Sequence, residues 1–371
     1  MRIAVLGAGG IIAPAIVRDL SASPGIEGLT LLDLDSARAR AVAERHGGGI
    51  ATAASVDARD RQALTLAVED HGLLLNAASY RCNLEAMDAA LAVGANYIDL
   101  GGLYHLTVRQ LGLHEAFQAA GLVAILGCGA GPGKTNVMAA RAARELGVVD
   151  EVRCASAGYD EAPPEGLAVP YALQTLLDEL TEPAVVVRDG ATVALEPLTG
   201  GGTVVFPPPI GERATIHTLH SEVATLPASL GAAACDFRLA LAPAVESALR
   251  DVVARGTAAP EVGTVPASDR TWSAQHVAVR GRRKDDGAPS TVTVTALTGP
   301  HEAWGLGGGI VSTATVASAT ARLLARGALG PVAGVLPPEQ VLTPELLFPE
   351  LEARGCVFTM SIQATSEVPA P

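Results

Sequence analysis

Aromatic residues are scarce in this chain of 371 residues: Phe, Trp and Tyr make up 3%, although hydrophobic residues reach 49%. A core built from this composition must consist mainly of Ala, Val and Leu. The length suits two domains and is sufficient to bury a large core. Glycine (40) and proline (24) are dispersed among apolar runs, which predicts many tight connections rather than disorder.

The sequence also has no closely spaced pair of cysteines, no excess of positive charge and no long apolar run. The five cysteines include no C-x-x-C, which excludes a disulfide framework or a cysteine zinc site; we expect no metal, and reduced thiols in a cytoplasmic protein. A net charge of −13 argues against a surface for nucleic acid or anionic membrane. No apolar stretch reaches about 18 residues without turn signals, so no membrane span is expected.

The N-terminal stretch has the pattern of a nucleotide-binding turn. The apolar run Ile3–Leu6 predicts a buried strand, glycines follow it, and Ile11–Leu20 has the apolar spacing of a helix. Gly7 permits a tight turn, and Gly9 lets the backbone approach a pyrophosphate that faces the helix amides. The third glycine of G-x-G-x-x-G is absent. The predicted contacts of this segment with a dinucleotide are Gly7, Gly9, Gly10 and Ile11.

The second predicted strand indicates which dinucleotide binds. Leu29–Leu32 is followed by Asp33, at the spacing where an acidic side chain accepts hydrogen bonds from the adenosine ribose. This carboxylate would repel a 2′-phosphate, and no arginine follows immediately to hold one. We therefore predict NAD, rather than NADP, as the cofactor.

Alternating strand and helix patterns continue through the first third of the chain. Six strands separated by helices within about 126 residues predict an α/β fold with a doubly wound, Rossmann-type parallel sheet. Ligands of such sheets lie beyond the carboxyl ends of the strands. The residues expected in that crevice are Asn76, Ala77, Ala78 and Cys128 for the cofactor, and Asp99 and Tyr104 for the substrate.

The pattern changes near Val152, where short β-rich runs begin. Asp189-Gly190 and the charged stretch 281–287 predict hairpin turns between these runs. We expect an α+β domain with a mixed sheet over residues 127–309, for substrate binding and for assembly into a homodimer or larger oligomer. The small-residue helix Ile310–Arg326 is expected to return to the first domain, which then comprises residues 1–126 and about 310–355. The tail from Thr365 is expected to be frayed.

Several motifs in order resemble one known family. The turn Gly127–Gly133, with the preceding stretch Tyr97–Gly102, resembles the saccharopine dehydrogenase family, in which G-x-x-P-G links the dinucleotide domain to a substrate domain. Asp178-Glu179-Leu180 and the closing stretch Gly334–Glu339 match further segments of that family. His217–Pro227 resembles the H-S-E-x-x-T-L-P stretch of its lysine 6-dehydrogenase branch. Gly131 and Lys134 stand where saccharopine-forming relatives carry acidic residues, which argues against condensation with glutamate.

The chemistry of amine oxidation points to particular residues. The amine of lysine is protonated at neutral pH, so a base must remove its proton before a hydride leaves. His220 and Glu222 face the same side if their segment is extended, and the histidine could take the proton while the carboxylate attracts the ammonium. The alternative is that this pair only holds a loop together. The predicted catalytic residues are His220, Glu222 and Asp99, and the predicted substrate-binding residues are Tyr104, Lys134 and Tyr171.

Three functions fit these features. The leading hypothesis is NAD-dependent oxidative deamination of the terminal amine of L-lysine, or a close basic analogue, to a semialdehyde that cyclises. A second is a reductase of the saccharopine or carboxyspermidine type, which joins an amine and an aldehyde through an imine. A third is a non-catalytic NAD-binding sensor or scaffold. The expected partners are a small amine substrate and further copies of the chain.

Overall fold

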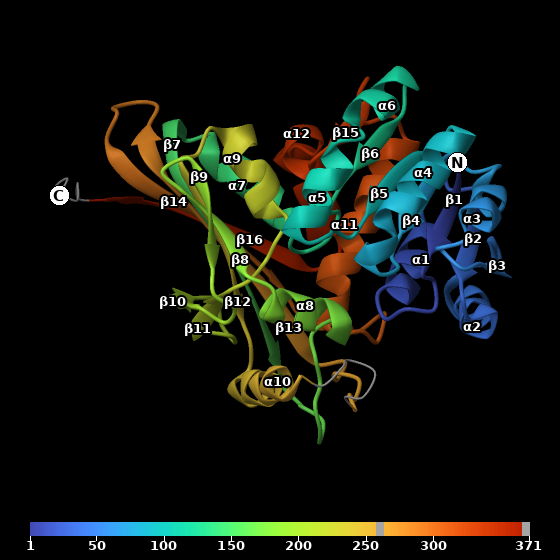
Figure 1. Cartoon of the computed structure of the whole chain (residues 1–371), viewed down its shortest axis with the longest axis horizontal. Coiled ribbons are helices and arrows are strands. Elements are labelled where there is room, and N and C mark those ends of the chain that lie inside the picture. The colour runs from blue at the N-terminus through green and yellow to red at the C-terminus, as the bar shows by residue number, and fades with distance from the viewer. Residues whose placement is uncertain (257–262, 366–371) are drawn as a thin grey trace. The chain divides into compact units, whose positions relative to one another are not determined.

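The computed structural model of the chain describes residues 1–256 and 263–365 (Figure 1). The chain forms two compact units: the first comprises Met1–Lys134 and Ile310–Arg354, and the second comprises Thr135–Gly309 and Gly355–Pro371. The glycine-rich turn 127–133 lies in the first unit and not, as expected from the sequence, in the second. The expected fraying beyond Thr365 concerns residues outside the described part of the chain.

The first unit contains a seven-stranded sheet in which every strand pair is parallel, with the order β15-β6-β5-β4-β1-β2-β3. The order reverses between β1 and β4, so this is the predicted doubly wound sheet with its switch point beside β1. The seventh strand, β15, was not expected. The strands are β1 (Arg2–Leu6), β2 (Gly28–Asp33), β3 (Ala51–Ser55), β4 (Leu73–Asn76), β5 (Asn96–Asp99), β6 (Val123–Ile125) and β15 (Gly334–Leu336).

Helices connect these strands. The apolar spacing over residues 108–120 favours a single helix, but the chain turns at Gly112 and forms two short helices. α2 begins at Ser36 because the Asp35 side chain accepts hydrogen bonds from the amides of Ala37 and Arg38 and so caps the helix. The helices are α1 (Ala13–Ser21), α2 (Ser36–His46), α3 (Arg61–Val68), α4 (Asn83–Val93), α5 (Tyr104–Leu111), α6 (His114–Ala119), α11 (Gly308–Ala325), α12 (Pro338–Val341) and α13 (Pro344–Glu352), with the 3-10 turn η1 (Tyr80–Cys82).

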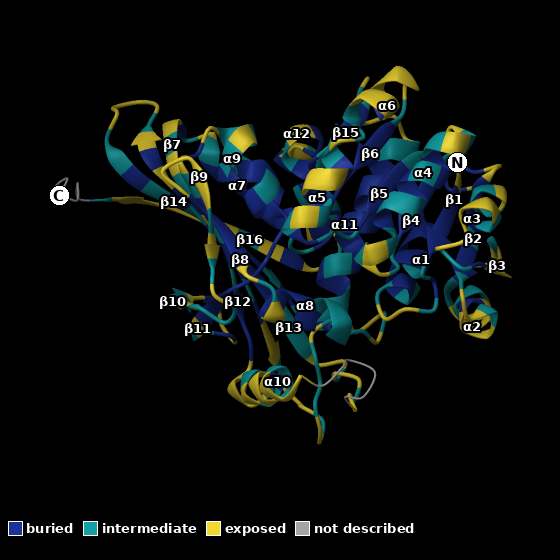
Figure 2. Cartoon of the chain, in the orientation of Figure 1, coloured by how far each residue is buried: buried dark blue, intermediate teal, exposed yellow. Residues whose placement is uncertain are grey.

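The core of the first unit is aliphatic, as the composition predicted. Leu73, Leu74 and Leu75 are all fully buried, because helices cover both faces of a doubly wound sheet. Tyr97 and Phe117 supply the large side chains of the same core. Figure 2 shows this buried centre along β4, β5 and α11, with exposed residues on the outer helices.

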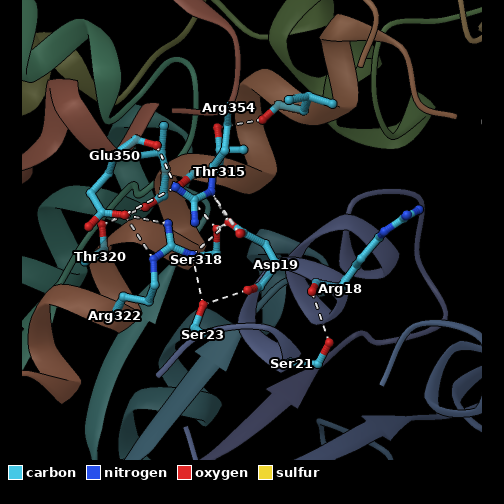
Figure 3. A network of polar contacts seen from close by, with 12 residues as sticks. Arg18, Asp19, Ser21, Ser23, Thr315, Ser318, Thr320, Arg322, Glu350 and Arg354 are labelled. Atoms are coloured by element: carbon cyan, nitrogen blue, oxygen red, sulfur yellow. Dashed lines mark hydrogen bonds and ion pairs between the residues drawn. The ribbon is translucent and has the colours of Figure 1, made fainter. Parts of the chain in front are cut away.

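Buried ion pairs connect α11 to the first and last helices of this unit (Figure 3). Asp19 of α1 receives the guanidinium groups of Arg322 (2.8 Å) and Arg354 (2.8 Å). Arg322 also contacts Glu350 of α13 at 2.9 Å, and Ser318 donates a hydrogen bond to Asp19. Asp19 and Arg322 are 5% and 3% exposed, so the network is effectively inside the protein. α11 therefore packs in the dinucleotide unit, as its position in the sequence predicted.

The second unit contains a mixed nine-stranded sheet, as expected. Its main order is β10-β11-β12-β7-β13-β14-β16, with β8 joining β12 and β9 joining β8; β12 and β7 run parallel and the other pairs are antiparallel. The hairpins at Asp189-Gly190 and at residues 284–288 are present. The strands are β7 (Leu146–Asp160), β8 (Ala184–Arg188), β9 (Ala191–Leu195), β10 (Gly200–Val205), β11 (Glu212–His217), β12 (Ala234–Ala240), β13 (Thr271–Arg283), β14 (Pro289–Thr298) and β16 (Cys356–Ala364).

Four helices accompany this sheet: α7 (Lys134–Ala143), α8 (Leu173–Thr181), α9 (Glu222–Leu230) and α10 (Pro243–Arg255). Leu176, Leu177 and Leu180 of α8 are buried against Ile216 and Leu239 of the sheet. This packing places the polar residues of α8 among buried neighbours, which matters for the acid–base chemistry below.

Candidate active site

The glycine turn after β1 packs directly on the backbone after β4. Gly7 has φ +78°, and a Cβ atom there would lie 2.5 Å from the Cα of Ala78. The amide of Ala77 donates to the carbonyl of Leu6 at 2.8 Å, which holds the two segments together. Only glycine satisfies both the backbone conformation and this close approach. Gly7, Ala77 and Ala78, all predicted cofactor contacts, thus lie together at the switch point of the sheet.

The N-terminus of α1 is suited to an anion. The first turn of the helix contains Pro14. No side chain caps this end of the helix, and no acidic residue in its first turn neutralises the positive end of the helix dipole. Gly10 closes the preceding turn by donating to the carbonyl of Gly7 at 3.0 Å. Ile11 is 63% exposed beside this turn. These features fit the pyrophosphate of a dinucleotide even though Ile12 replaces the third glycine of the fingerprint.

Asp33 ties the glycine turn to the end of β2. Its Oδ2 atom accepts a hydrogen bond from the Gly9 amide at 2.8 Å, and its Oδ1 atom accepts from the Asp35 amide at 2.9 Å. A Cβ atom at Gly9 would lie 2.9 Å from the Cβ of Arg38, so this arginine stands beside the turn. Arg38 does not follow Asp33 immediately in the sequence, but the first turn of α2 brings it back beside the glycine turn.

Asn76 fixes the other side of the predicted cofactor crevice. Its Oδ1 atom accepts from the amide of Ala78 at 3.0 Å, and its Nδ2 atom donates to Oδ1 of Asn83 at 2.9 Å. Asn76 is 1% exposed. It therefore shapes the backbone at residues 77–78, and its contribution to cofactor binding is to hold that backbone in place.

Asp99 is the centre of a buried hydrogen-bond network. Its Oδ1 atom accepts from the amides of Gly101 (2.9 Å) and Gly127 (2.6 Å). Its Oδ2 atom accepts from Gln110 (2.7 Å), Tyr97 (3.1 Å) and Asn83 (3.1 Å). Burial raises the pKa of Asp99, and the hydrogen bonds oppose that rise. A carboxylate with both oxygens engaged and 1% exposure holds the strand ends together, and the catalytic role of Asp99 stays a prediction.

The glycine-rich turn after β6 packs around Pro132. A Cβ atom on Gly101 or Gly127 would lie 2.6 or 2.7 Å from Cγ of Pro132. Within this turn Cys128 is fully buried, and burial raises the pKa of its thiol far above the ordinary value, which makes it an unreactive neutral group.

The other two predicted substrate residues of the first unit differ in exposure. Lys134 is 1% exposed and its Nζ atom donates to Oγ of Ser312 at 2.6 Å, so it is anchored in the protein. Tyr104, the first residue of α5, is partly exposed and lies edge-on to His105 with 5.3 Å between ring centroids. Tyr104 is therefore the more accessible of the two.

A second cluster of chemistry-bearing side chains lies in the second unit, and we call it the acid–base cluster. Glu222, fully buried, accepts from Nδ1 of His220 at Oε2 and from the hydroxyl of Thr135 at Oε1 (2.6 Å). The His220 ring is stacked on Phe237. The cluster consists of Thr135, Tyr171, Glu179, His220 and Glu222.

His220 and Glu222 are brought together without an extended segment. The segment is not extended: His220 lies in the loop after β11, and α9 begins at Glu222. The two side chains meet nevertheless, because the chain turns into the helix between them. Both oxygens of Glu222 accept hydrogen bonds, so Glu222 orients His220; the attraction of a substrate ammonium by this carboxylate stays a prediction.

Glu179 completes the cluster and was missed as a site residue. Tyr171 donates its hydroxyl to Oε2 of Glu179 at 2.5 Å, and Glu179 is 4% exposed. Burial raises the pKa of Glu179 to about 7, with His220 and Tyr171 opposing the rise. The available signal was an acidic residue on the apolar face of a leucine-rich segment, in Asp178-Glu179-Leu180.

The charges of this cluster act on His220 in turn. Burial by itself lowers the pKa of His220, but the carboxylates of Glu222 and Glu179 outweigh it and raise the pKa above the ordinary value. Because Nδ1 faces Glu222, the Nε2 atom is the nitrogen left to exchange a proton. A histidine with this environment is suited to general acid–base chemistry near neutral pH.

The N-terminal part of the chain is similar to a known domain family. Residues 3–125 match the family model described as the saccharopine dehydrogenase NADP binding domain. The match covers the N-terminal part of the chain. This domain binds a nicotinamide dinucleotide, and the close approach at Gly7, the open end of α1 and the position of Asp33 fit that ligand.

Relatives extend the likeness to the second unit. A carboxyaminopropylagmatine dehydrogenase of Synechocystis sp. is 26% identical over 237 residues, which are 61% of this chain and 58% of that protein. The saccharopine dehydrogenase (L-Glu forming) of Saccharomyces cerevisiae has a TM-score of 0.71 at 14% identity, covering 98% of this chain and all of that one. The homospermidine synthase of Legionella pneumophila, solved with NAD, has a TM-score of 0.73 at 12% identity, covering 100% and 93%. The two structures share the fold of both units.

Residues 1–256 and 263–365 lack two kinds of feature. None of the helices there combines the length and apolar character needed to cross a membrane. The same residues include no group of three or more His, Cys, Asp or Glu side chains arranged to hold a metal ion.

Proposed function

We propose that this chain is an NAD-dependent oxidoreductase that interconverts an amine and an imine, with His220 as the acid–base residue. The observation that carries the proposal is the buried pair of His220 and Glu222 in a chain whose other unit is a nicotinamide dinucleotide-binding domain. A bound nicotinamide ring supplies the hydride acceptor for amine oxidation.

His220 removes the proton that makes the amine unreactive. Glu222 holds Nδ1, so that Nε2 takes the proton from the substrate ammonium, and the resulting imidazolium is stabilised by the same carboxylate. In the reverse direction His220 returns this proton to the amine nitrogen.

Glu179 supplies the negative charge next to which a cationic amine binds. Its raised pKa lets it hold a proton in the empty cluster and lose it when a cation arrives. Tyr171 fixes the Glu179 carboxyl through its hydroxyl, which gives this predicted substrate residue a positioning role. Tyr104 and Lys134 are retained as proposed contacts of other polar parts of the substrate.

NAD is the proposed cofactor. Asp33 presents its carboxylate at the end of β2, where the adenosine ribose of a dinucleotide lies, and a 2′-phosphate would meet this negative charge. Arg38 offers a competing positive charge, but its guanidinium is 3.4 Å from Asp35, which partly neutralises it. The balance of charge therefore supports NAD.

Two substrate classes fit the proposed chemistry. The H-S-E-x-x-T-L-P-like stretch that contains His220 supports a primary amine, the terminal amine of L-lysine or a close analogue. The Synechocystis relative, by its name a dehydrogenase of carboxyaminopropylagmatine, supports a secondary amine formed from an amine and a carbonyl compound. We propose the lysine-type oxidation first and the joining reaction as the alternative.

The test is the absorbance of NADH on mixing the chain with NAD and a panel of diamines and basic amino acids. Oxidation without a carbonyl partner supports the primary-amine reaction. Turnover that requires NADH, an amine and an aldehyde together supports the joining reaction. If the chain binds NAD but turns over no member of either panel, the proposal fails and the sensor or scaffold hypothesis replaces it.

A further inference from the structure

A small cavity lies on the sheet of the second unit, away from the acid–base cluster. It has a volume of about 150 Å³, far more than the roughly 10–15 Å³ that one water molecule requires. Three arginines, two acidic residues and one histidine line it: Arg153, Arg188, Arg238, Glu151, Asp236 and His217. The strands around it, β7, β8, β11 and β12, are adjacent in the sheet.

The side-chain alternation of β12 separates this cavity from the acid–base cluster. Phe237 points toward His220, on which it stacks, and successive residues of a strand face opposite sides. Asp236 and Arg238 therefore lie on the other face, where the cavity is. The parallel register places Arg153 of β7 beside Asp236 on that face. The cavity is thus a separate feature of the sheet.

The charges that line the cavity are unequally neutralised. Arg238 makes a two-pronged contact with Asp236 (2.7 and 2.8 Å), and Arg153 contacts Glu151 at 2.8 Å. Arg188 ends β8, is exposed, and makes no ion pair or side-chain hydrogen bond with any residue that the structure describes. Three arginines against two carboxylates leave the cavity with one positive charge, although the chain as a whole carries −13.

His217 adds a polar group that the protein itself does not satisfy. It is 8% exposed, and its Nδ1 atom has no hydrogen-bond partner in the described part of the chain. Burial lowers the pKa of His217, and Arg238, Arg188 and Arg153 lower it further against the opposing effect of Asp236. His217 therefore adds a polar ring to the lining of the cavity, and its buried Nδ1 atom without a partner is unfavourable.

We infer that this cavity binds a small oxyanion, a carboxylate or phosphate group, at a site distinct from that of amine oxidation. In this proposal Arg188 donates hydrogen bonds to the anion. The guanidinium groups of Arg153 and Arg238, which are already oriented by Glu151 and Asp236, lie around it. Guanidinium groups suit planar carboxylates and phosphates because they donate two parallel hydrogen bonds.

The test is isothermal titration calorimetry of the full chain in the absence of NAD and amine. Orthophosphate and succinate are titrated in separate experiments at constant ionic strength. We expect one saturable site for at least one of the two anions; the anion that saturates identifies the phosphate or the carboxylate class. Arg188→Gln should weaken binding by about tenfold or more. Arg255→Gln, which removes an equal charge from the exposed end of α10, should leave the affinity within about twofold.

The His220→Asn variant separates this site from the proposed catalytic one, and it should bind the anion as the parent does. No saturation by either anion, or equal affinities in the Arg188→Gln and Arg255→Gln variants, would overturn the inference. Neither result depends on whether the chain oxidises amines.

Discussion

The ring of His220 lies face to face with the ring of Phe237, with 3.5 Å between centroids and 4° between planes. Glu222 holds Nδ1 of the same ring from its edge. Two contacts of this kind fix both the tilt and the rotation of the imidazole, so that Nε2 has one direction in which to exchange a proton. A histidine placed this way is prepared for chemistry before any substrate binds.

Glu222→Gln should change the pH dependence of turnover. His220 acts as a base when it is neutral, so the rate of amine oxidation rises with pH through its raised pKa. Removing the carboxylate charge should move this rise to lower pH by about 1–3 units and lower the maximal rate. The pH profile of kcat is the measurement, with Glu212→Gln on the exposed start of β11 as the control.

The same substitution has a signature in stability. A histidine whose pKa is higher in the folded state than in the unfolded state stabilises the fold when it is protonated. This stability is fully present at pH values below the pKa of the unfolded state, about 6.5, and is lost as the pH rises through the pKa of the folded state. The melting temperatures of Glu222→Gln and the parent should therefore differ more at low pH than at high pH. A pH profile of kcat that does not move would show that Glu222 does not act through His220.

Asp33→Ala should weaken NAD binding and reduce the discrimination against NADP. The substitution removes a hydrogen bond to the ribose, the contacts of Asp33 with the Gly9 and Asp35 amides, and the repulsion of a 2′-phosphate. Together these losses should change the binding free energies of the two nucleotides by on the order of 1–3 kcal/mol. Adding Arg38→Ala should then lower the affinity for NADP again, because Arg38 lies beside the turn. Dissociation constants for both nucleotides test this, and a parent enzyme that prefers NADP would refute the role given to Asp33.

The first unit was largely predictable because its signals are local. Apolar runs followed by glycine or acidic residues indicate strands of a doubly wound sheet, and Asp33 follows from spacing alone. β15 was missed because its three residues, Gly334–Leu336, form a strand only beside β6. The break at Gly112 divides a helix whose apolar spacing runs through it.

The acid–base cluster was only partly predictable because it is built by tertiary contacts. His220 and Glu222 are neighbours in sequence, so their pairing could be expected, although the helix start at Glu222 could not. Glu179 meets Tyr171 and His220 only because α8 packs its leucine face on the sheet. The engagement of Asp99 by five donors likewise depends on segments that are far apart in the chain.

Asp19→Asn should destabilise the first unit. Arg322 would remain buried without a full partner, and the loss of one member of a buried ion pair typically costs about 3–5 kcal/mol. Asp70→Asn, at an exposed contact 3.9 Å from Arg2, should cost about 0–1 kcal/mol. Thermal melting of both variants is the measurement, and equal melting temperatures would contradict the structural role of the network.

The pH dependence of this network has a defined sign. Burial tends to raise the pKa of Asp19, but Arg354, Arg322 and Ser318 outweigh it and hold the pKa below the ordinary value. The stability that Asp19 contributes is therefore present above its unfolded pKa, about 3.9, and is lost as pH falls through the folded value. The difference between Asp19→Asn and the parent should shrink in strong acid.

We predict that the chain assembles as a homodimer or larger oligomer, mainly through the second unit. β16 lies at the end of the sheet order, and its residues Cys356–Ala364 include no charge and no proline to prevent edge pairing. Val357, Met360 and Ile362 of this strand are exposed. Light scattering at micromolar concentration is the measurement, and the mass of a monomer would contradict the prediction.

The most direct test of the account is the turnover number of His220→Asn beside its affinity for NAD. We expect kcat for amine oxidation to fall by roughly 10²–10⁴, the usual contribution of a positioned base, with the NAD dissociation constant unchanged. His46→Asn, at the end of α2, should retain full activity. A His220→Asn protein that melts normally and turns over at the parental rate per active site would contradict the proposed role of His220.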